Sequence, residues 1–439
     1  MNDLSCLPPG PKWGFWQPLA YAQSAYHFLP KVHARYGDPF TVHFSLPTVV
    51  TGHPDGIRQI FTAPVDTFCV LIPMSIRRVL GEQDLRAIGG EAHRRPRKLI
   101  APGFQKTALD DIGLMIHEST VQALKNWRDG DTIDINNALQ DITLEVILKT
   151  VFGVDGRADF EPFRLAVKNL AASWGNPSYM LSAALRIDSD EWPPNRRVNI
   201  ARRKLADLLL DDIKKRRTRE EQRGDILSRL MEARFEDGGG FSDEDLVDSL
   251  LTNLLAGLTG TALLMTWLFA WMGRHEHVAE RIQQEIDGLD RDDDIDAIQA
   301  LPYLDAAFRE CLRLYPQVPL VMRGLAKPLQ VRGYELPAGI NIAACSAVLH
   351  MDPDIYPQPE LFNPDRFLER NYNGFEYIPF GGGYKMCVGN HLSMLQVKVM
   401  LAVLLSRGRF SQLDKGPLKV KYLGLLMGPA DVRACFNAK

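Results

Sequence analysis

A cysteine that could bind a metal lies near the end of a glycine-rich stretch, Phe380–Gly389. The stretch reads Phe-Gly-Gly-Gly-Tyr-Lys-Met-Cys-Val-Gly and is followed by an apolar run, from His391 to Leu405, that is typical of a helix. Glycine lacks a Cβ and readily adopts positive φ, so this loop can bring its backbone close to a flat group. The free N–H groups and the dipole at a helix N-terminus favour a thiolate over a thiol, and a thiolate is a good metal ligand. The pattern therefore predicts that Cys387 binds a metal, although a lone cysteine is more often a buried packing residue.

Two groups of charged residues could support such a site. His93 and Arg97 are four residues apart in a strongly basic stretch, so on a helix they share one face, unless the stretch is an ordinary solvated surface. Glu310 and Arg313 are three residues apart on an otherwise apolar helix, and a buried ion pair needs further partners to offset its desolvation. Arg366 could be that partner, unless Glu310 and Arg313 form an ordinary surface pair.

Composition narrows the class of protein. The chain has 439 residues, of which 46% are hydrophobic, and a formal net charge of −3. With a mean hydropathy of −0.15, these values describe a globular protein with a large core, and they give no case for nucleic acid or an anionic membrane as partner. The six cysteines form no CxxC pair, which is typical of reduced cytoplasmic thiols. Because we find no run of about 18 apolar residues and no secretory signal, we expect a cytoplasmic protein without a membrane span.

The elements that position these residues are mostly helices. No linker divides the chain, so we predict a single domain over residues 1–439 that begins with an extended, proline-rich segment over 1–20. Amphipathic helices are expected between 110 and 235, with the charge run 214–223 as a solvated face or a mobile tip. Ser242 and Asp245 form a capping-box pattern ahead of the longest apolar element, which we expect to be a buried helix. That helix should run from Asp243 to about Arg274.

The remaining elements are shorter. An acidic loop over 287–298 is expected to precede a helix, Pro302–Tyr315, which ends at a proline. The β-prone segments are hairpins over 40–51 and 418–436 and strands at 329–331, 334–336 and 340–344. The sequence therefore predicts a mainly α-helical fold with small β-sheets, of the α+β class.

Taken in order, these motifs resemble the cytochrome P450 superfamily, and the resemblance covers nearly the whole chain. The string Phe-Gly-x-Gly-x-basic-x-Cys-x-Gly is similar to the haem-binding loop of that family. The resemblance implies a helical lobe, a smaller β-rich lobe and haem b as cofactor, with Cys387 as the iron ligand. It places Phe380 near the ligand sulfur and Lys385 at a haem propionate, where the family usually has arginine or histidine.

The same resemblance gives roles to the other charged residues. It implies that His93, Arg97 and Arg323 contact haem propionates, although Arg323 alone could equally be a surface arginine on a strand. It also implies that Glu310, Arg313 and Arg366 hold the loop that carries the cysteine.

The long apolar helix departs from the family pattern. Family monooxygenases usually carry Ala/Gly-Gly-x-acid-Thr where this helix crosses the haem face, and the acid and alcohol deliver protons for dioxygen activation. Here Ala256 and Gly257 match, whereas Thr259 stands in place of the acid and Gly260 in place of the alcohol. Using Thr261 instead would turn the hydroxyl by about 100° around the helix axis. We take Thr259, Gly260 and Thr261 as the candidate catalytic positions.

Three accounts of this departure stay open. In the first, dioxygen is used and the protons come from water held by Thr259 or Gly257, or from a hydroxyl on the substrate. In the second, the enzyme uses hydrogen peroxide, or catalyses a rearrangement that needs no proton relay. In the third, Thr259 only bonds its own i−4 carbonyl, while Leu258 and Gly260 make room for a bulky substrate. We favour the first account combined with the room-making of the third; a non-catalytic haem-binding sensor is the alternative outside enzymes.

The segments that line the family's substrate pocket are apolar here. Such a lining suits a lipophilic substrate, such as a terpenoid, polyketide-like or fatty compound of secondary metabolism. The candidate pocket residues are Phe68, Leu71, Met74, Trp174, Leu258, Val318, Leu320, Val321, Leu425 and Met427.

No flavin or nicotinamide domain is fused to the chain, so the resemblance implies a separate electron donor of the ferredoxin or flavodoxin kind. Arg94, Arg95, Lys98 and Lys385 could meet the acidic surface of such a donor. We expect a monomer that is a soluble, bacterial member of the family.

Overall fold

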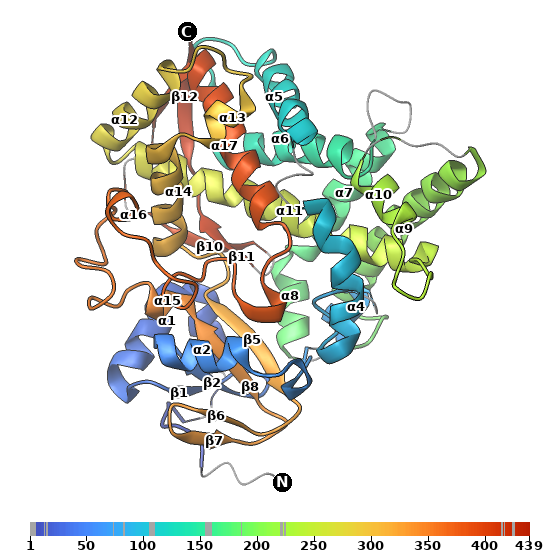
Figure 1. Ribbon diagram of the computed structural model, residues 1–439, viewed down its shortest axis with the longest axis vertical. Coiled ribbons are helices and arrows are strands. Elements are labelled where there is room, and N and C mark those ends of the chain that lie inside the picture. The colour runs from blue at the N-terminus through green and yellow to red at the C-terminus, as the bar shows by residue number, and fades with distance from the viewer. Residues whose placement is uncertain are drawn as a thin grey trace.

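The computed structural model describes residues 6–12, 14, 16–72, 74–81, 84–104, 110–153, 160–185, 187–219, 223, 225–413, 416, 418–423 and 426–439. Helices make up most of the molecule, and a smaller part near the N-terminus carries the largest sheet (Figure 1). The predicted class, mainly α with small β-sheets, is confirmed.

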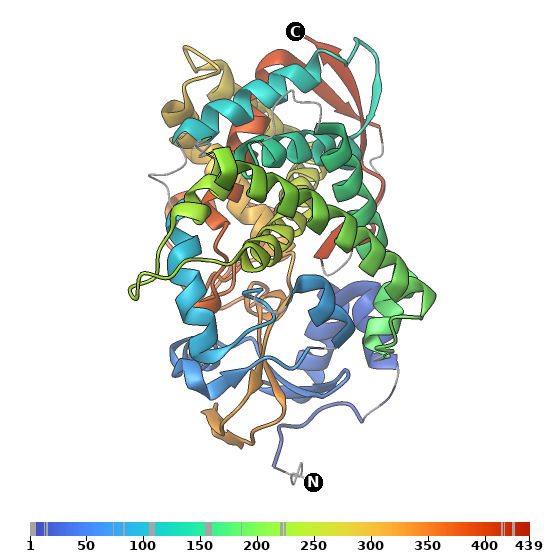
Figure 2. The ribbon, with the colours of Figure 1, turned by 90° about the vertical axis from the view of Figure 1, so that its right-hand side faces the viewer.

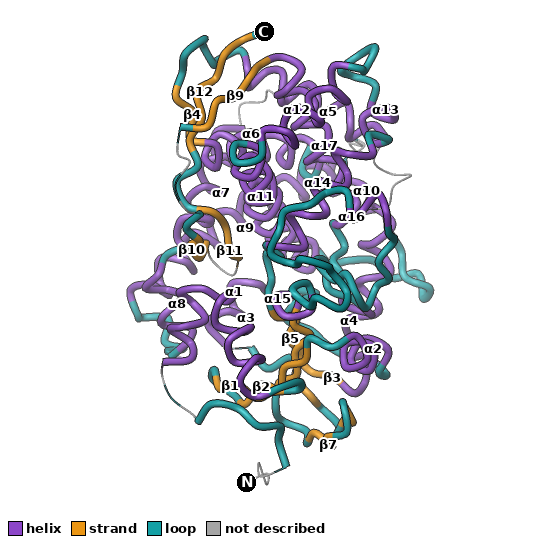
Figure 3. Tube along the Cα trace, turned by 90° about the vertical axis from the view of Figure 1, so that its left-hand side faces the viewer, coloured by secondary structure: helices purple, strands orange, loops and turns teal. Residues whose placement is uncertain are grey.

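The helices follow one another along the chain with few strands between them. They are α1 (Trp16–Tyr36), α2 (Pro54–Thr62), α3 (Met74–Leu80), α4 (Gly90–Ile100), α5 (Asp110–Leu124), α6 (Ile135–Thr150), α7 (Phe160–Trp174), α8 (Pro177–Ala184), α9 (Pro193–Arg219), α10 (Ile226–Glu232), α11 (Asp243–Met272), α12 (Glu276–Asp287), α13 (Ile295–Gln299), α14 (Pro302–Leu314), α15 (Ser346–Leu349), α16 (Arg366–Glu369) and α17 (Asn390–Arg407). The segment between α15 and α17 is mostly loop (Figure 3).

The strands are short. They are β1 (Phe40–His43), β2 (Pro47–Thr51), β3 (Phe68–Cys69), β4 (Thr132–Asp134), β5 (Leu320–Leu325), β6 (Leu329–Val331), β7 (Tyr334–Leu336), β8 (Asn341–Cys345), β9 (Gly408–Gln412), β10 (Val420–Leu423), β11 (Leu426–Pro429) and β12 (Arg433–Ala438).

The largest sheet has five strands in the order β1-β2-β8-β5-β3. The predicted first hairpin is present as β1 and β2, and β6 pairs with β7 across the turn that the sequence predicts. β2 pairs in parallel with β8, and β5 lies antiparallel to both β8 and β3. This arrangement carries Arg323 of β5, opposite Ile342 of β8, into the interior next to the loop that bears Cys387.

The longest helix, α11, runs through the middle of the helical part (Figures 1 and 2). It begins with the predicted capping box, in which the Ser242 side chain accepts a hydrogen bond from the Asp245 N–H and the Asp245 side chain accepts one from the Ser242 N–H. Among the described residues, α11 is the one helix long and apolar enough to cross a membrane by length and composition, and 78% of its most apolar stretch is buried inside the fold, as expected for a buried helix. A helix that is apolar on all sides lies in a protein core as readily as in a bilayer.

Two segments expected to be irregular contain helices. α1 begins at Trp16, inside the proline-rich segment, and α13 begins at Ile295, inside the acidic loop. The Asp294 side chain accepts a hydrogen bond from the Ala297 N–H and so caps α13, while Ile295 and Ile298 are buried beneath it. The C-terminal segment forms the predicted hairpin from β10 and β11, but its last part is β12, which pairs with β9 and β4.

The described helical part of the charge run, residues 214–219, is the solvated face that we expected except at Arg216, because every other residue there is exposed. Arg216 is fully buried, with Nε 2.9 Å from an Asp212 oxygen and Nη1 2.8 Å from an Asp225 oxygen. The same guanidinium donates to the Ser228 hydroxyl and to the Phe152 carbonyl. A buried arginine is tolerated when acceptors surround it, and here the acceptors come from α9, α10 and the end of α6.

Candidate active site

The loop before α17 is shaped by its glycines. Gly381 and Gly383 have φ of +69° and +62°, a region that side chains disfavour. A Cβ on Gly382 would lie 2.2 Å from the ring of Phe61, so a larger residue there would force a shift. The loop therefore packs its backbone tightly against the last turn of α2.

Cys387 follows these glycines, three residues before α17 begins at Asn390. Its N–H donates to the Phe380 carbonyl at 3.0 Å, which closes the loop. The side chain is exposed, yet burial raises the pKa of the Cys387 thiol, while the Gly389 N–H and then Arg97 act in the opposite direction. A thiol that protein surrounds on most sides but that stays open on one side can accept a ligand there. We expected the helix N-terminus to favour the thiolate, but burial has the larger effect and raises the pKa of Cys387. A bound metal ion deprotonates a coordinating thiol.

Three cations, Arg97, Arg323 and Lys385, lie beside this loop together with His93. Arg323 donates to the Ile60 carbonyl at 3.1 Å and to the Gly382 carbonyl at 2.6 Å, and its Nε has no partner. Lys385 donates to the Ile88 carbonyl at 2.7 Å. Among the residues that the structure describes, neither cation makes an ion pair with a carboxylate. The cluster thus consists of positive groups held by neutral carbonyls.

The lowered pKa values of this cluster indicate that, within the described residues, it lacks negative counter-charges. Burial lowers the pKa of Lys385 to about 8 and that of Arg323 to about 10, and it also lowers the pKa of Arg97. The pKa of His93 falls to about 3 because of burial and then of Lys385, Arg97 and Arg323, and its buried Nδ1 has no partner. Buried positive charges are costly unless paired, so the cluster requires anionic groups. The two propionates of haem fit this requirement.

Three aromatic rings surround the Arg323 guanidinium, and of these the sequence had assigned only Phe68, as a candidate pocket residue. Its guanidinium carbon lies 4.8 Å from the centre of the Tyr384 ring, 4.9 Å from that of Phe68 and 5.1 Å from that of Phe61. The Tyr384 ring also meets the His93 ring edge-on, with centroids 5.2 Å apart. Tyr384 stands between the loop glycines and Lys385, and an aromatic residue next to a basic one was the only signal for it in the sequence.

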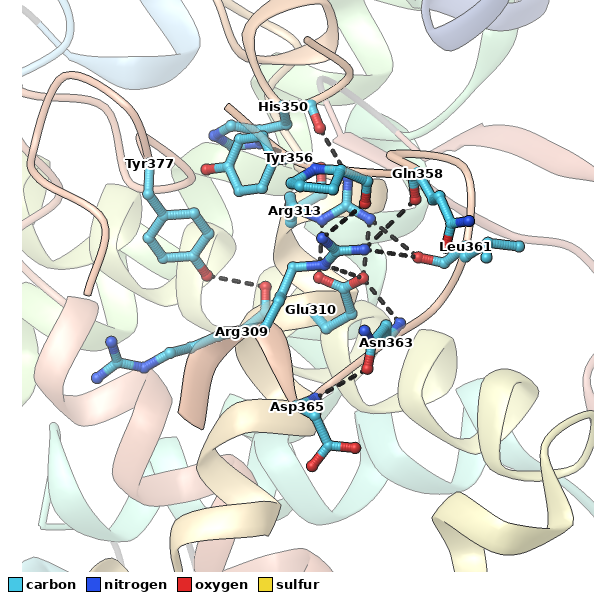
Figure 4. Close-up of polar contacts among 12 residues, drawn as sticks. Arg309, Glu310, Arg313, His350, Tyr356, Gln358, Leu361, Asn363, Asp365 and Tyr377 are labelled. Atoms are coloured by element: carbon cyan, nitrogen blue, oxygen red, sulfur yellow. Dashed lines mark hydrogen bonds and ion pairs between the residues drawn. The ribbon is translucent and has the colours of Figure 1, made fainter. Parts of the chain in front are cut away.

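The structure brings Glu310, Arg313 and Arg366 together in the interior (Figure 4). Arg313 Nε lies 2.7 Å from one Glu310 oxygen, and Arg313 Nη2 and Arg366 Nε lie 2.8 Å and 3.1 Å from the other. Arg313 also donates to the His350 carbonyl at 2.7 Å, and His350 Nε2 accepts from the Ile378 N–H at 3.0 Å. These bonds connect α14 to the residues just before Phe380, and His350 is a link that the sequence did not reveal.

Thr261 and Gly260 of α11 make contacts with different elements. Thr261 Oγ1 lies 3.5 Å from Ser393 Oγ of α17, so its side chain faces that helix. In the described part of the chain, Thr259 makes no bond to its i−4 carbonyl, unlike Thr266, which donates to the Ala262 carbonyl at 2.7 Å. The Gly260 carbonyl accepts a hydrogen bond from the Gln317 side chain, a contact that the sequence did not predict.

The candidate pocket residues differ in exposure. Phe68, Trp174, Leu258, Leu320 and Met427 are buried, and Leu71 and Val321 are half-buried. Met74 and Val318 are exposed, and Leu425 lies outside the described residues.

The cations expected to meet an electron donor fall into two sets. Arg94, Arg95 and Lys98 are exposed on α4, where Arg95 pairs with Asp237 and Lys98 lies 3.0 Å from a Glu236 oxygen. Lys385 does not belong with them, because its amine is turned inward to backbone carbonyls.

Comparison with known proteins agrees with this geometry. The cytochrome P450 family pattern matches residues 6–436. A *Mycobacterium bovis* protein provisionally named cytochrome P450 138 is 29% identical over 410 residues, which cover 91% of this chain and 89% of that protein. A *Mycobacterium tuberculosis* protein provisionally named cytochrome P450 135B1 is 29% identical over 434 residues, which cover 96% of this chain and 89% of that protein.

Solved structures show the same fold. The structure described as retinoic acid bound cyanobacterial CYP120A1 superposes with a TM-score of 0.86 and 25% identity, covering 99% of this chain and all of that one. The haem domain of cytochrome P450DA superposes with a TM-score of 0.85 at 20% identity, covering 99% of this chain and 98% of that one. The family implies haem b, a substrate and a redox partner in general. The chain therefore belongs to the cytochrome P450 family, as a haem-thiolate oxidoreductase of the monooxygenase type.

Proposed function

We propose that this P450 uses dioxygen to oxidise a lipophilic small molecule, by hydroxylation or a related reaction, and that Cys387 is its iron ligand. The observation that carries the proposal is a cluster of cations beside the glycine loop that ends in this cysteine: Arg323 is buried, Arg97 and Lys385 are half-buried, and Arg323 and Lys385 make no ion pair with any described carboxylate. When bound, haem supplies an iron that the axial thiolate makes electron-rich, which favours oxygen activation.

The residues of the chain bind and orient the cofactor. Arg97, Arg323 and Lys385 neutralise the propionates, and the neutral His93 donates or accepts a hydrogen bond through its partnerless Nδ1. Phe380 shields the ligand sulfur from water. Glu310, Arg313 and Arg366 keep the preceding segment in place without taking part in the chemistry.

The substrate class follows from the apolar lining. Buried Trp174, Leu258, Leu320 and Met427 offer apolar surface and no charge, which suits a terpenoid, polyketide-like or fatty compound of secondary metabolism. The structural neighbour that binds retinoic acid, a lipophilic molecule, supports this class.

Electrons come from a separate acidic protein of the ferredoxin or flavodoxin kind, which meets the exposed cations Arg94, Arg95 and Lys98 of α4. We place the protein in the cytoplasm, as a monomer with a single domain over residues 1–439.

The test is spectroscopic and kinetic. The dithionite-reduced, carbonylated protein should show the thiolate signature in its Soret band, and Cys387→Ala should lose it. Product formation with NAD(P)H and a ferredoxin should consume oxygen. A native protein without the thiolate signature would refute the proposal, and gas binding without turnover would indicate a haem sensor.

A second candidate function is supported by the distal helix. With Thr259 and Gly260 in place of the usual acid and alcohol, the enzyme could be a peroxygenase or catalyse a rearrangement. Turnover with hydrogen peroxide alone, or product formed under argon, would favour this candidate.

A further inference from the structure

A glutamine side chain binds the core helix at the position where the family carries its alcohol. The Gln317 side-chain nitrogen donates a hydrogen bond to the Gly260 carbonyl of α11. The Gln317 carbonyl in turn accepts a hydrogen bond from the Met427 N–H of β11 at 3.3 Å. Gln317, in the loop between α14 and β5, therefore joins α11 to the C-terminal hairpin.

The missing side chain of Gly260 makes room for this amide. A Cβ on residue 260 would lie 3.3 Å from Gln317 Oε1, closer than an ordinary contact, and 3.9 Å from Leu426 Cδ1. A threonine would extend a methyl and a hydroxyl group from that Cβ. The side chains at positions 260 and 317 thus compete for the same space, although a glycine in a helix interior is about 1 kcal/mol less favourable than alanine.

The bound amide keeps an acceptor free. Because its NH₂ group faces the Gly260 carbonyl, the other terminal atom is the oxygen, whose two lone pairs can accept hydrogen bonds. Within the described residues, no group donates a hydrogen bond to this Oε1. Thr261 offers no comparable group on this side, because its hydroxyl faces Ser393.

We propose that Gln317 is a positioning residue that takes the place of the distal alcohol, with Oε1 holding a water molecule through which protons reach the oxygen-activating centre. The proposal rests on the proposed function. In each turnover, dioxygen, two electrons from the donor, two protons from solvent and one substrate C–H bond give a hydroxylated product and one water. The amide gains and loses no proton; it fixes the water that passes protons on.

The first experiment compares two oxidants. Gln317→Leu keeps the size and removes the amide, and Gln330→Leu, at the exposed position of β6, is the matched control. Product formed per NAD(P)H should fall about tenfold in Gln317→Leu, as expected for the loss of one hydrogen bond. Product formed with hydrogen peroxide, which already carries both electrons and both protons, should stay close to that of the wild type.

The second experiment measures stability. In the wild-type background Gly260→Ala should not raise the unfolding midpoint, because its Cβ presses on Gln317. In the Gln317→Ala background the same change should raise the midpoint by about 2 °C, since the better helix former then fits. Gly260→Thr combined with Gln317→Ala should restore product formed per NAD(P)H.

The outcomes separate the two proposals. Equal loss with both oxidants, or no loss with either, in a variant with a wild-type carbonyl spectrum would overturn the role of Gln317. If Gln317→Leu does not fold, Gln317→Glu can be tested instead, because glutamate keeps the shape of the side chain. The product that this variant forms per NAD(P)H (its coupling) should rise as the pH falls, because only the protonated acid can donate to the Gly260 carbonyl. Coupling that does not depend on pH would count against the proposal. A wild-type protein without the thiolate spectrum would instead overturn the proposed function.

Discussion

Removing the charge of Glu310 should destabilise the protein far more than removing that of an exposed glutamate in the same kind of pair. Glu310 accepts four hydrogen bonds: at one oxygen from Arg313 Nη2, Arg366 Nε and the Asn363 N–H, and at the other from Arg313 Nε. In Glu310→Gln one oxygen becomes an NH₂ group that faces a guanidinium donor.

The magnitude follows from burial. The Glu310 and Arg313 side chains are 0% exposed and Arg366 is 6% exposed, so the two guanidiniums lose their counter-charge in a dry site. Breaking a buried pair by removing one partner costs about 3–5 kcal/mol. This is a large part of the roughly 5–15 kcal/mol that stabilises a typical protein.

The assay is urea unfolding of the haem-loaded protein, together with the yield of protein that forms the carbonyl complex. Glu161→Gln is the control, because Glu161 and Arg164 form the same i, i+3 pair with three hydrogen bonds, but on the surface. Its unfolding midpoint should not change measurably. If Glu310→Gln does not fold, Arg366→Lys, which keeps the charge but loses the fork, should cost about 1–2 kcal/mol. Equal midpoints for Glu310→Gln and Glu161→Gln would show that the buried trio does not stabilise the fold.

Three further predictions follow from the same structure. Burial lowers the pKa of His350 from its ordinary 6.5 to about 3. Between these two pH values only the unfolded chain binds the proton, so His350 lowers the free energy of unfolding by about 1.4 kcal/mol for each unit by which the pH falls. Urea unfolding between about pH 7 and about pH 4 should show a shallower slope for His350→Gln, and an unchanged slope would contradict the assignment. Gly382→Ala should lower the free energy of unfolding by about 1–3 kcal/mol and reduce haem retention, because its Cβ would meet the Phe61 ring. Gly374→Ala, whose Cβ would meet nothing within 4 Å, should behave like the wild type. Arg94→Glu with Lys98→Glu should slow reduction by an acidic ferredoxin at low salt, whereas Arg291→Glu, on the segment before α13, should not; equal rates in stopped-flow measurements would exclude α4 as the docking face.

The elements that the sequence predicted correctly carry local signals. The capping box of Ser242 and Asp245 marks the start of α11, and the turn at Arg332 and Gly333 fixes the β6–β7 hairpin. Each signal lies within a few residues, so physical chemistry along the chain is sufficient to find it. The glycine loop before Cys387 is of the same kind.

The features that the sequence did not reveal depend on contacts between distant segments. Gln317 meets Gly260 across 57 positions, and Arg216 meets the Phe152 carbonyl across 64. Arg216 is the one buried residue among the exposed residues 214–219, and its acceptors come from segments that the local sequence does not bring together. Its burial is decided by packing between those segments.

Helix α4 shows how one short segment can serve two electrostatic environments. His93 and Arg97, four residues apart, face the interior cluster, whereas Arg94, Arg95 and Lys98 face solvent and acidic side chains. Interior charges are screened little by salt, whereas exposed ones more than about 10 Å from a partner are screened strongly at about 0.1 M. Cofactor retention and partner docking can therefore respond differently to ionic strength, although the residues proposed for the two roles lie within the same six residues, 93–98. What appeared in the sequence as one basic stretch is two sets of cations, and the helical period alone assigns each residue to its set.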